Sequence, residues 1–264
     1  MLSYFQAMGN EQEIKLRIEC LNCGAQVHGK YCSQCGQKVQ PTKLPVKHLA
    51  GELFETVFNT DNRLFKTLKD LFLRPGSITR KYNKGKRQRY ISPVRLYLSI
   101  SVIYFLLVKL IPTDQIFLIS FSEDEQLSPY LDKIVQYLLF FMVPVMAGWA
   151  QLLHRRRKRF YVEYLVLALH IHTILFVLLG LQLVGVWLAG IAQAYEVPGS
   201  DIFSIALDAI IQFGIFLYPI LFLKNAFKQS WAKAIMRGIA LMTLYVISLV
   251  GVVFLVFLIS ESLK

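Results

Sequence analysis

The sequence predicts an all-α polytopic membrane protein with about five transmembrane helices, a small metal-binding segment at its N-terminus and amphipathic helices between the two. Three observations predict this class. Of the 264 residues, 55% are hydrophobic, and the mean hydropathy of +0.46 lies well above that of ordinary globular proteins. Long apolar runs follow Pro93, and all four cysteines lie between positions 20 and 35.

Five stretches are long and apolar enough to cross a bilayer as helices, which takes about 20 residues each. The third and fifth exceed this length, so they should tilt or extend past the headgroups. The alternative is a large buried core, but soluble helices of this length normally carry a polar stripe. The five predicted spans are 94–111, 134–153, 164–192, 202–223 and 234–259.

Loop charge predicts the orientation, because basic residues near span ends stay on the cytoplasmic side. Basic clusters precede the first span and separate the second from the third and the fourth from the fifth, whereas the other two loops are acidic. No cleavable signal peptide is expected at the start of the chain. The N-terminus is therefore predicted inside and the C-terminus outside. The net charge of +12 reflects this topology and attraction to anionic lipid headgroups, so no nucleic-acid partner is expected.

The cysteines form two CxxC pairs that predict a metal site. Cys20, Cys23, Cys32 and Cys35 are the candidate ligands, and a glycine follows each pair. Two intervening residues let one tight turn direct both sulfurs at a single ion, and the glycine allows the positive φ that such a turn needs. Four thiolates complete the tetrahedral coordination of one Zn²⁺ per chain, so the site is expected to be structural.

The same four cysteines could also form disulfides or hold an iron–sulfur centre. A disulfide pair would need an oxidising compartment, which the predicted cytoplasmic location excludes. An iron–sulfur centre uses the same ligands and stays open. Zinc is favoured because so short a segment has too little core to fold without a metal. His28, between the pairs, is interpreted as a solvated loop residue.

Three regions follow from these patterns: a cytosolic N-terminus at 1–44 with the zinc ribbon at 20–37, a basic amphipathic connector at 45–92, and a transmembrane domain at 93–264. Apolar residues in the connector recur at three-to-four spacing on either side of 59–62, which indicates two amphipathic helices. These helices could lie on the lipid surface or pack on the protein's own spans, and the two arrangements are compatible.

The order of these motifs resembles an uncharacterised family of bacterial inner-membrane proteins, a domain of unknown function with a CxxC…CxxC zinc ribbon joined to several spans. The resemblance implies this architecture and a location in the bacterial inner membrane, but no activity. Lys81 stands where the family pattern has an acidic residue. The matching positions are Cys20, Cys23, Gly24, Gly29, Tyr31, Cys32, Cys35, Gly36 and Gln37 in the ribbon, and Thr67, Leu71, Arg74, Pro75, Gly76, Tyr82, Gly85, Lys86, Arg87, Tyr90 and Pro93 after it.

Ionisable residues within spans are candidates for function, because they are costly to place there. Glu163 and His170 lie on one helical face and form a possible intramembrane polar site, with His170 the stronger candidate. A surface ion pair is the favoured reading of Glu163. No nucleophile elbow, phosphate-binding glycine loop or metalloprotease motif occurs, so we expect no catalytic residues.

The sequence therefore favours a non-enzymatic membrane protein, an accessory or adaptor subunit whose cytosolic zinc ribbon binds a protein partner or regulates it. The alternative is a small permease or channel with a polar path near Glu163 and His170. A membrane enzyme acting on lipid has the least support.

The predicted topology is testable by labelling. Cysteines introduced at Ser122 and Ser200 should react with an impermeant external thiol reagent, because both positions fall in acidic loops, while one at Ser230 should not. If only the cysteine introduced at Ser230 were labelled, the protein would have the opposite orientation in the membrane.

Overall fold

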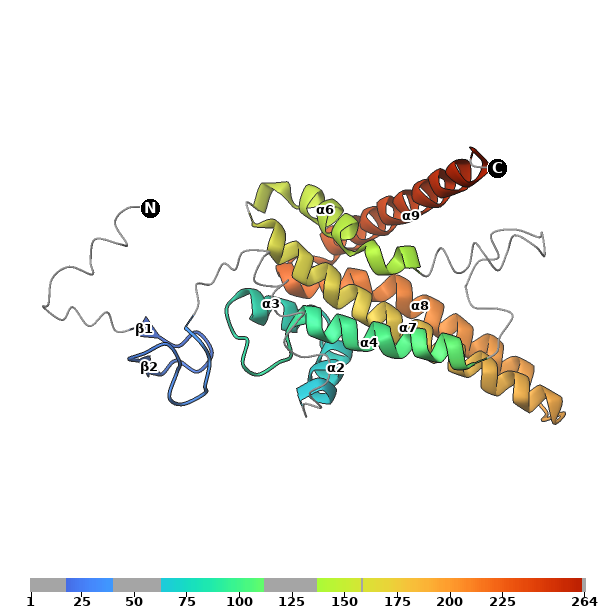
Figure 1. Ribbon diagram of the computed structural model, residues 1–264, viewed down its shortest axis with the longest axis horizontal. Coiled ribbons are helices and arrows are strands. Elements are labelled where there is room, and N and C mark those ends of the chain that lie inside the picture. The colour runs from blue at the N-terminus through green and yellow to red at the C-terminus, as the bar shows by residue number, and fades with distance from the viewer. Residues whose placement is uncertain (1–17, 40–62, 112–136, 158, 263–264) are drawn as a thin grey trace, which may run out of the picture.

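A computed structural model describes residues 18–39, 63–111, 137–157 and 159–262, and it confirms a helical membrane protein with a small N-terminal ribbon (Figure 1). The ribbon contains a two-stranded antiparallel sheet. The helices form a bundle with α2 and α3 against it (Figure 1). The elements are β1 (Ile18–Glu19), β2 (Gln26–Val27), α2 (Arg63–Leu73), α3 (Ser77–Asn83), α4 (Pro93–Leu110), α6 (Val143–Leu153), the 3-10 turn η2 (Arg155–Arg157), α7 (Tyr161–Ala194), α8 (Ser200–Phe227) and α9 (Trp231–Ser262).

Within the described residues, four helices are long and apolar enough to cross a membrane: α4, α7, α8 and residues Trp231–Val256 of α9. They correspond to the first, third, fourth and fifth predicted spans. With 34 and 32 residues, α7 and α9 are each about 50 Å long, well beyond the roughly 30 Å of the hydrocarbon core. The extra length expected for these two spans is therefore present.

The second predicted span, 134–153, differs from the expectation of one continuous helix. Residues 137–141 are helical, the helix is interrupted at Met142, and α6 then has only 11 residues. Pro144 is the physical cause, because it has no N–H to donate to the carbonyl of Phe140. That carbonyl instead accepts a hydrogen bond of 2.7 Å from the Tyr97 hydroxyl of α4. This shorter apolar segment does not reach spanning length by itself.

Helix α7 forms the centre of the bundle and packs against α4, α6 and α8, while α9 packs on α8 and α6. Among the described residues, two hydrogen bonds join α9 to the other helices: the Tyr245 hydroxyl lies 3.0 Å from His172 Nε2, and Trp149 Nε1 donates to Ser248 Oγ at 2.8 Å. Away from these contacts, α9 diverges from α7 and α8 (Figure 1).

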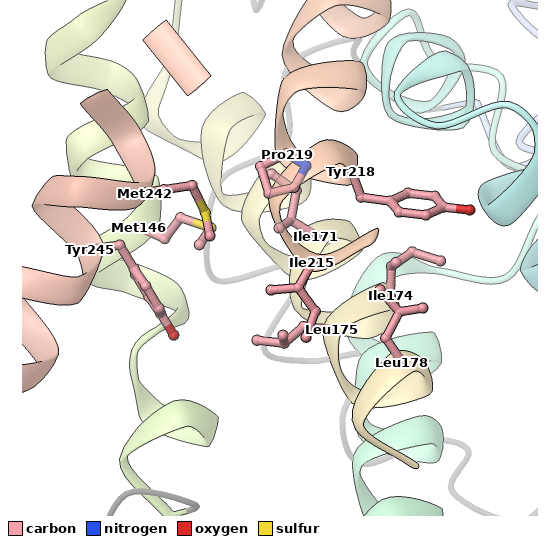
Figure 2. A pocket seen from close by; sticks show the side chains of 10 residues that line it. All are labelled: Met146, Ile171, Ile174, Leu175, Leu178, Ile215, Tyr218, Pro219, Met242 and Tyr245. Carbon is pink, nitrogen blue, oxygen red and sulfur yellow. The ribbon is translucent and has the colours of Figure 1, made fainter. Parts of the chain in front are cut away.

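A cavity of about 30 Å³ lies between α6, α7, α8 and α9, with almost entirely apolar walls (Figure 2). This space would hold a single water molecule, but apolar cavities of this kind stay dry. Tyr218 carries its hydroxyl away from the cavity (Figure 2) and donates to the carbonyl of Phe72 at the end of α2 at 3.1 Å. The cavity therefore offers no polar path.

The described part of the connector, residues 63–92, packs on the protein's own spans. Pro75 and Gly76 form the turn between α2 and α3, and Gly76 has a left-handed φ of 76°. A Cβ at Gly76 would lie 2.5 Å from the carbonyl oxygen of Phe222 and 2.9 Å from the nitrogen of Ala226, both in the backbone of α8. Asn225 Nδ2 donates to the Pro75 carbonyl at 2.8 Å. Only glycine permits this close approach.

Helix α2 is the second of the two predicted amphipathic helices, whereas the first falls at 45–58, outside the described residues. Thr67 and Leu71 are buried on its inner face, and Phe65 and Leu73 are exposed on its outer face. The inner face of α2 thus packs against the rest of the protein, and its outer face has exposed apolar side chains.

Replacing Gly76 with alanine tests this packing. Gly76→Ala should destabilise the protein by about 2 kcal/mol or more, because it combines backbone strain with a clash against α8. Gly148→Ala in α6 is the matched control, since a Cβ there meets nothing within 4 Å. The measurement is the melting temperature in detergent. Equal melting temperatures for the two variants would contradict the predicted role of Gly76.

Candidate metal centre and its docking surface

The two CxxC pairs form turns with the same hydrogen bonding. Gly24 N donates to the Cys20 carbonyl and Gly36 N to the Cys32 carbonyl, each at 2.8 Å. Both glycines have positive φ, 81° and 69°, as the sequence predicted. The β1–β2 pair and a bridge between Tyr31 and Lys38 bring the two turns together.

The four sulfur atoms lie within 4.8 Å of one another. Cys20 Sγ and Cys35 Sγ are 3.6 Å apart, as are Cys23 Sγ and Cys32 Sγ. These separations are far longer than a disulfide bond. They match the edge of about 3.8 Å expected for four sulfurs at 2.3 Å from a central ion. The donor set therefore fits one tetrahedral metal ion.

Two of the cysteines have pKa values shifted in opposite directions. Backbone N–H groups of Cys35 and Gln34, directed at the sulfur, lower the pKa of Cys32 to about 7. At Cys23 the N–H of Ala25 acts in the same direction, but desolvation and the neighbouring thiols raise its pKa to about 12. Cysteine binds a metal as the thiolate, so a divalent cation displaces the proton of Cys23 when it binds. His28 is exposed and lies outside the cluster.

One side chain attaches the ribbon to the rest of the protein. Gln37 follows the second cysteine turn; its Nε2 donates to the Gly85 carbonyl at 2.8 Å, and its Oε1 accepts from the backbone N–H groups of Arg87 and Gln88 at 3.2 Å. Leu21 packs against Gly85, where a Cβ would lie 2.7 Å from Leu21 Cδ1. The turn at 85–88 is therefore a docking surface for the ribbon.

This docking turn is held in place by α2. Thr67 Oγ1 accepts from the N–H of Ile91 at 3.2 Å, and the Tyr90 hydroxyl donates to Asp70 Oδ2 at the same distance. Lys81 Nζ donates to the Tyr90 hydroxyl at 3.1 Å. Lys81 thus supports a structural contact.

Helix α3 continues the connection into the bundle. Thr79 Oγ1 lies 2.9 Å from His170 Nδ1 of α7, and both residues are fully buried. Arg80 Nη1 donates to the Asn225 carbonyl of α8 at 2.9 Å. Sequence reasoning did not identify Thr79 or Asn225, because neither belongs to a recognisable motif and each acts through a distant partner.

The structure does not place Glu163 and His170 in a shared site. Glu163 Oε2 accepts from Arg159 Nη1 at 2.6 Å, in a pair that remains partly exposed. His170 bonds to Thr79, and its Nε2 has no hydrogen-bond partner among the described residues. His172, on a different face, bonds to the Ala168 carbonyl and Tyr245. Each group thus has its own separate contacts.

The fold and the cysteine cluster define a polytopic helical membrane protein with an N-terminal ribbon whose four clustered cysteines could hold a metal ion. Residues 61–105 match the family described as protein of unknown function (DUF3667). This similarity covers α2, α3 and the first two-thirds of α4, and includes every matching position from Thr67 to Pro93. No curated protein and no solved structure matches the chain.

Metal analysis tests the ribbon. Cys20→Ser and Cys35→Ser should each abolish stoichiometric metal binding by the purified protein, because three thiolates leave the tetrahedron incomplete. His28→Ala is the control and should keep about one metal ion per chain. Full occupancy in both serine variants would contradict the assignment of the ligands.

Proposed function

We propose that the protein is a non-enzymatic adaptor or accessory subunit of the cytoplasmic membrane. In this proposal the ribbon binds one structural Zn²⁺, lies in the cytosol and presents a surface to a protein partner. The helical bundle anchors the ribbon, and the docking turn at 85–88 holds it at a defined position beside the membrane.

The observation that carries the proposal is the triple hydrogen bond of Gln37 to the docking turn. Cys32, Cys35 and Gln37 belong to one turn, so metal binding by the cysteines sets the position of the glutamine. The contacts continue through Thr67 and α3 to α7 and α8. Metal binding and the position of the ribbon are therefore linked by a continuous set of contacts.

The ribbon also has a surface suited to a partner. Tyr31 is 60% exposed and pairs with exposed Lys38 across the isolated bridge. Lys30 is exposed next to them. Tyrosine is enriched at protein interfaces, and the lysines on either side would favour a partner with an acidic surface.

The permease alternative rests on Glu163 and His170. The ion pair of Glu163 with Arg159 and the separate bond of His170 to Thr79 favour structural roles for both residues. The apolar lining of the cavity between α6, α7, α8 and α9 gives the alternative no support either.

A photocrosslinker at Tyr31 tests the adaptor proposal. The full-length protein in native membranes should crosslink one recurrent protein, and Lys30→Glu or Lys38→Glu should reduce that product about tenfold through charge repulsion while zinc content stays unchanged. Lys233→Glu, an exposed charge reversal on α9, is the control. Gln37→Leu should also reduce crosslinking without loss of zinc, because the ribbon loses its attachment.

A different outcome would favour transport. If liposomes containing the protein carry an ion flux that persists in the ribbon variants and vanishes in His170→Ala, the adaptor proposal is wrong.

A further inference from the structure

At the basic end of the bundle, the α6–α7 turn and the α8–α9 turn meet around the ring of Phe227. The His154 ring lies 4.4 Å from this ring, and the guanidinium groups of Arg157 and Arg159 lie 5.4 Å and 5.3 Å from it. Arg157 Nη1 donates to the Phe227 carbonyl at 2.7 Å. The cationic groups are thus held against a rigid part of the fold.

Positive charge at this end greatly exceeds negative charge. In the described parts of 154–166 and 224–237, the one carboxylate is Glu163, and Arg159 already pairs with it. Arg237 Nη1 donates to Gln229 Oε1 at 2.8 Å. Burial lowers the pKa of Arg157, and the charges of Arg159 and Arg237 lower it further. The basic residues are Arg155, Arg156, Arg157, Arg159, Lys224, Lys228, Lys233 and Arg237.

Two buried side chains beside these cations have unpaired polar atoms. Gln229 is 7% exposed, and its Nε2 has no hydrogen-bond partner in the described residues. His154 is 1% exposed; its Nδ1 bonds to the Ala150 carbonyl at 2.9 Å, and its Nε2 is also unpaired within the described ranges. Buried polar groups nearly always have partners, so this pair indicates that a ligand completes the site.

We propose that His154, Arg157, Gln229 and Arg237 form a binding site for a phosphate group. Phosphate oxygens accept from the Gln229 amide and from guanidinium groups, whose fork geometry suits them. Arg157 is exposed and Arg237 is partly exposed, so an anion reaches them from solvent. Gln229, in direct contact with Arg237, provides the buried donor.

His154 fits a phosphate monoester in particular. With Nδ1 donating to the Ala150 carbonyl, Nε2 is an acceptor. Burial, aided by Arg237 and Arg157, lowers the pKa of His154 to about 4 against the opposing effects of the Ala150 carbonyl and the adjacent Gln229 amide, so the ring is neutral at pH 7. A monoester, whose second pKa is about 6, can take up a proton from solvent as it binds and donate it to Nε2, whereas a diester cannot. Two sources offer this chemistry: the headgroup of a lipid such as phosphatidic acid, and soluble phosphate.

The general excess of basic residues on the cytoplasmic side of membrane proteins does not explain these features. Residues retained only for topology need no fixed partners and no buried amide beside them. Here Arg157 is bound to a main-chain carbonyl and Arg237 to Gln229, so both are preorganised. The site is also separate from the ribbon and its docking turn, and it stands whether or not the ribbon binds a partner.

Titration calorimetry on the full-length protein in detergent tests the site, with dioctanoyl phosphatidic acid and inorganic phosphate as separate probes. Dioctanoyl phosphatidylglycerol, a diester of equal chain length, is the comparison ligand. We expect the monoester lipid to bind most tightly. Gln229→Leu and Arg237→Gln should each weaken its binding about tenfold or more, the loss expected for a hydrogen bond to a charged group.

Lys233→Gln is the matched control, because it removes one exposed charge from the same region without touching the cluster, and its affinity should change less than about twofold. If Gln229→Leu or Arg237→Gln does not fold, Arg157→Gln, a substitution at an exposed position, is measured in its place. Tight binding of inorganic phosphate would identify a soluble ligand, and binding of the lipid alone would identify a headgroup site. Equal losses in Lys233→Gln and the cluster variants, or unchanged binding in Gln229→Leu and Arg237→Gln, would overturn the proposal.

Discussion

The close approach of the Pro75–Gly76 turn to the backbone of α8 is the contact on which the rest of the arrangement depends. A residue with a Cβ at position 76 would meet the Phe222 carbonyl, so the chain can reverse against α8 only because glycine stands there. This reversal places Thr79 opposite His170. The polar groups at the junction pair with each other, which makes residues 63–92 an integral part of the bundle.

From this contact the structure extends outward in steps. Helices α2 and α3 hold the loop at 85–92, the loop holds Gln37, and Gln37 holds the ribbon. The ribbon has a core of only a few residues around Cys20, Val27 and Cys32, so a metal ion held by the four cysteines would supply much of its folding free energy. The similarity to the family of unknown function covers the middle of this series, the part that joins the ribbon to the spans.

Positive charge at the basic end has a structural role as well as a topological one. The last carbonyls of a helix lack partners within it and carry partial negative charge. At the end of α8, the Asn225 carbonyl accepts from Arg80 and the Phe227 carbonyl from Arg157. Guanidinium groups from α3 and from the α6–α7 turn thus complete the end of α8 and join three segments that are distant in sequence.

The sequence alone determined the helical membrane class, four of the spans and the four clustered cysteines, because hydrophobic run length and CxxC spacing are local properties. The tertiary structure decided the remainder. The interruption at Met142 follows from Pro144, but the Tyr97 hydroxyl that accommodates it comes from another helix. Glu163 and His170 share a helical face, yet their partners, Arg159 and Thr79, separate their roles. Gln37 and Thr79 act through residues far away in the chain, and no local pattern specifies such pairings.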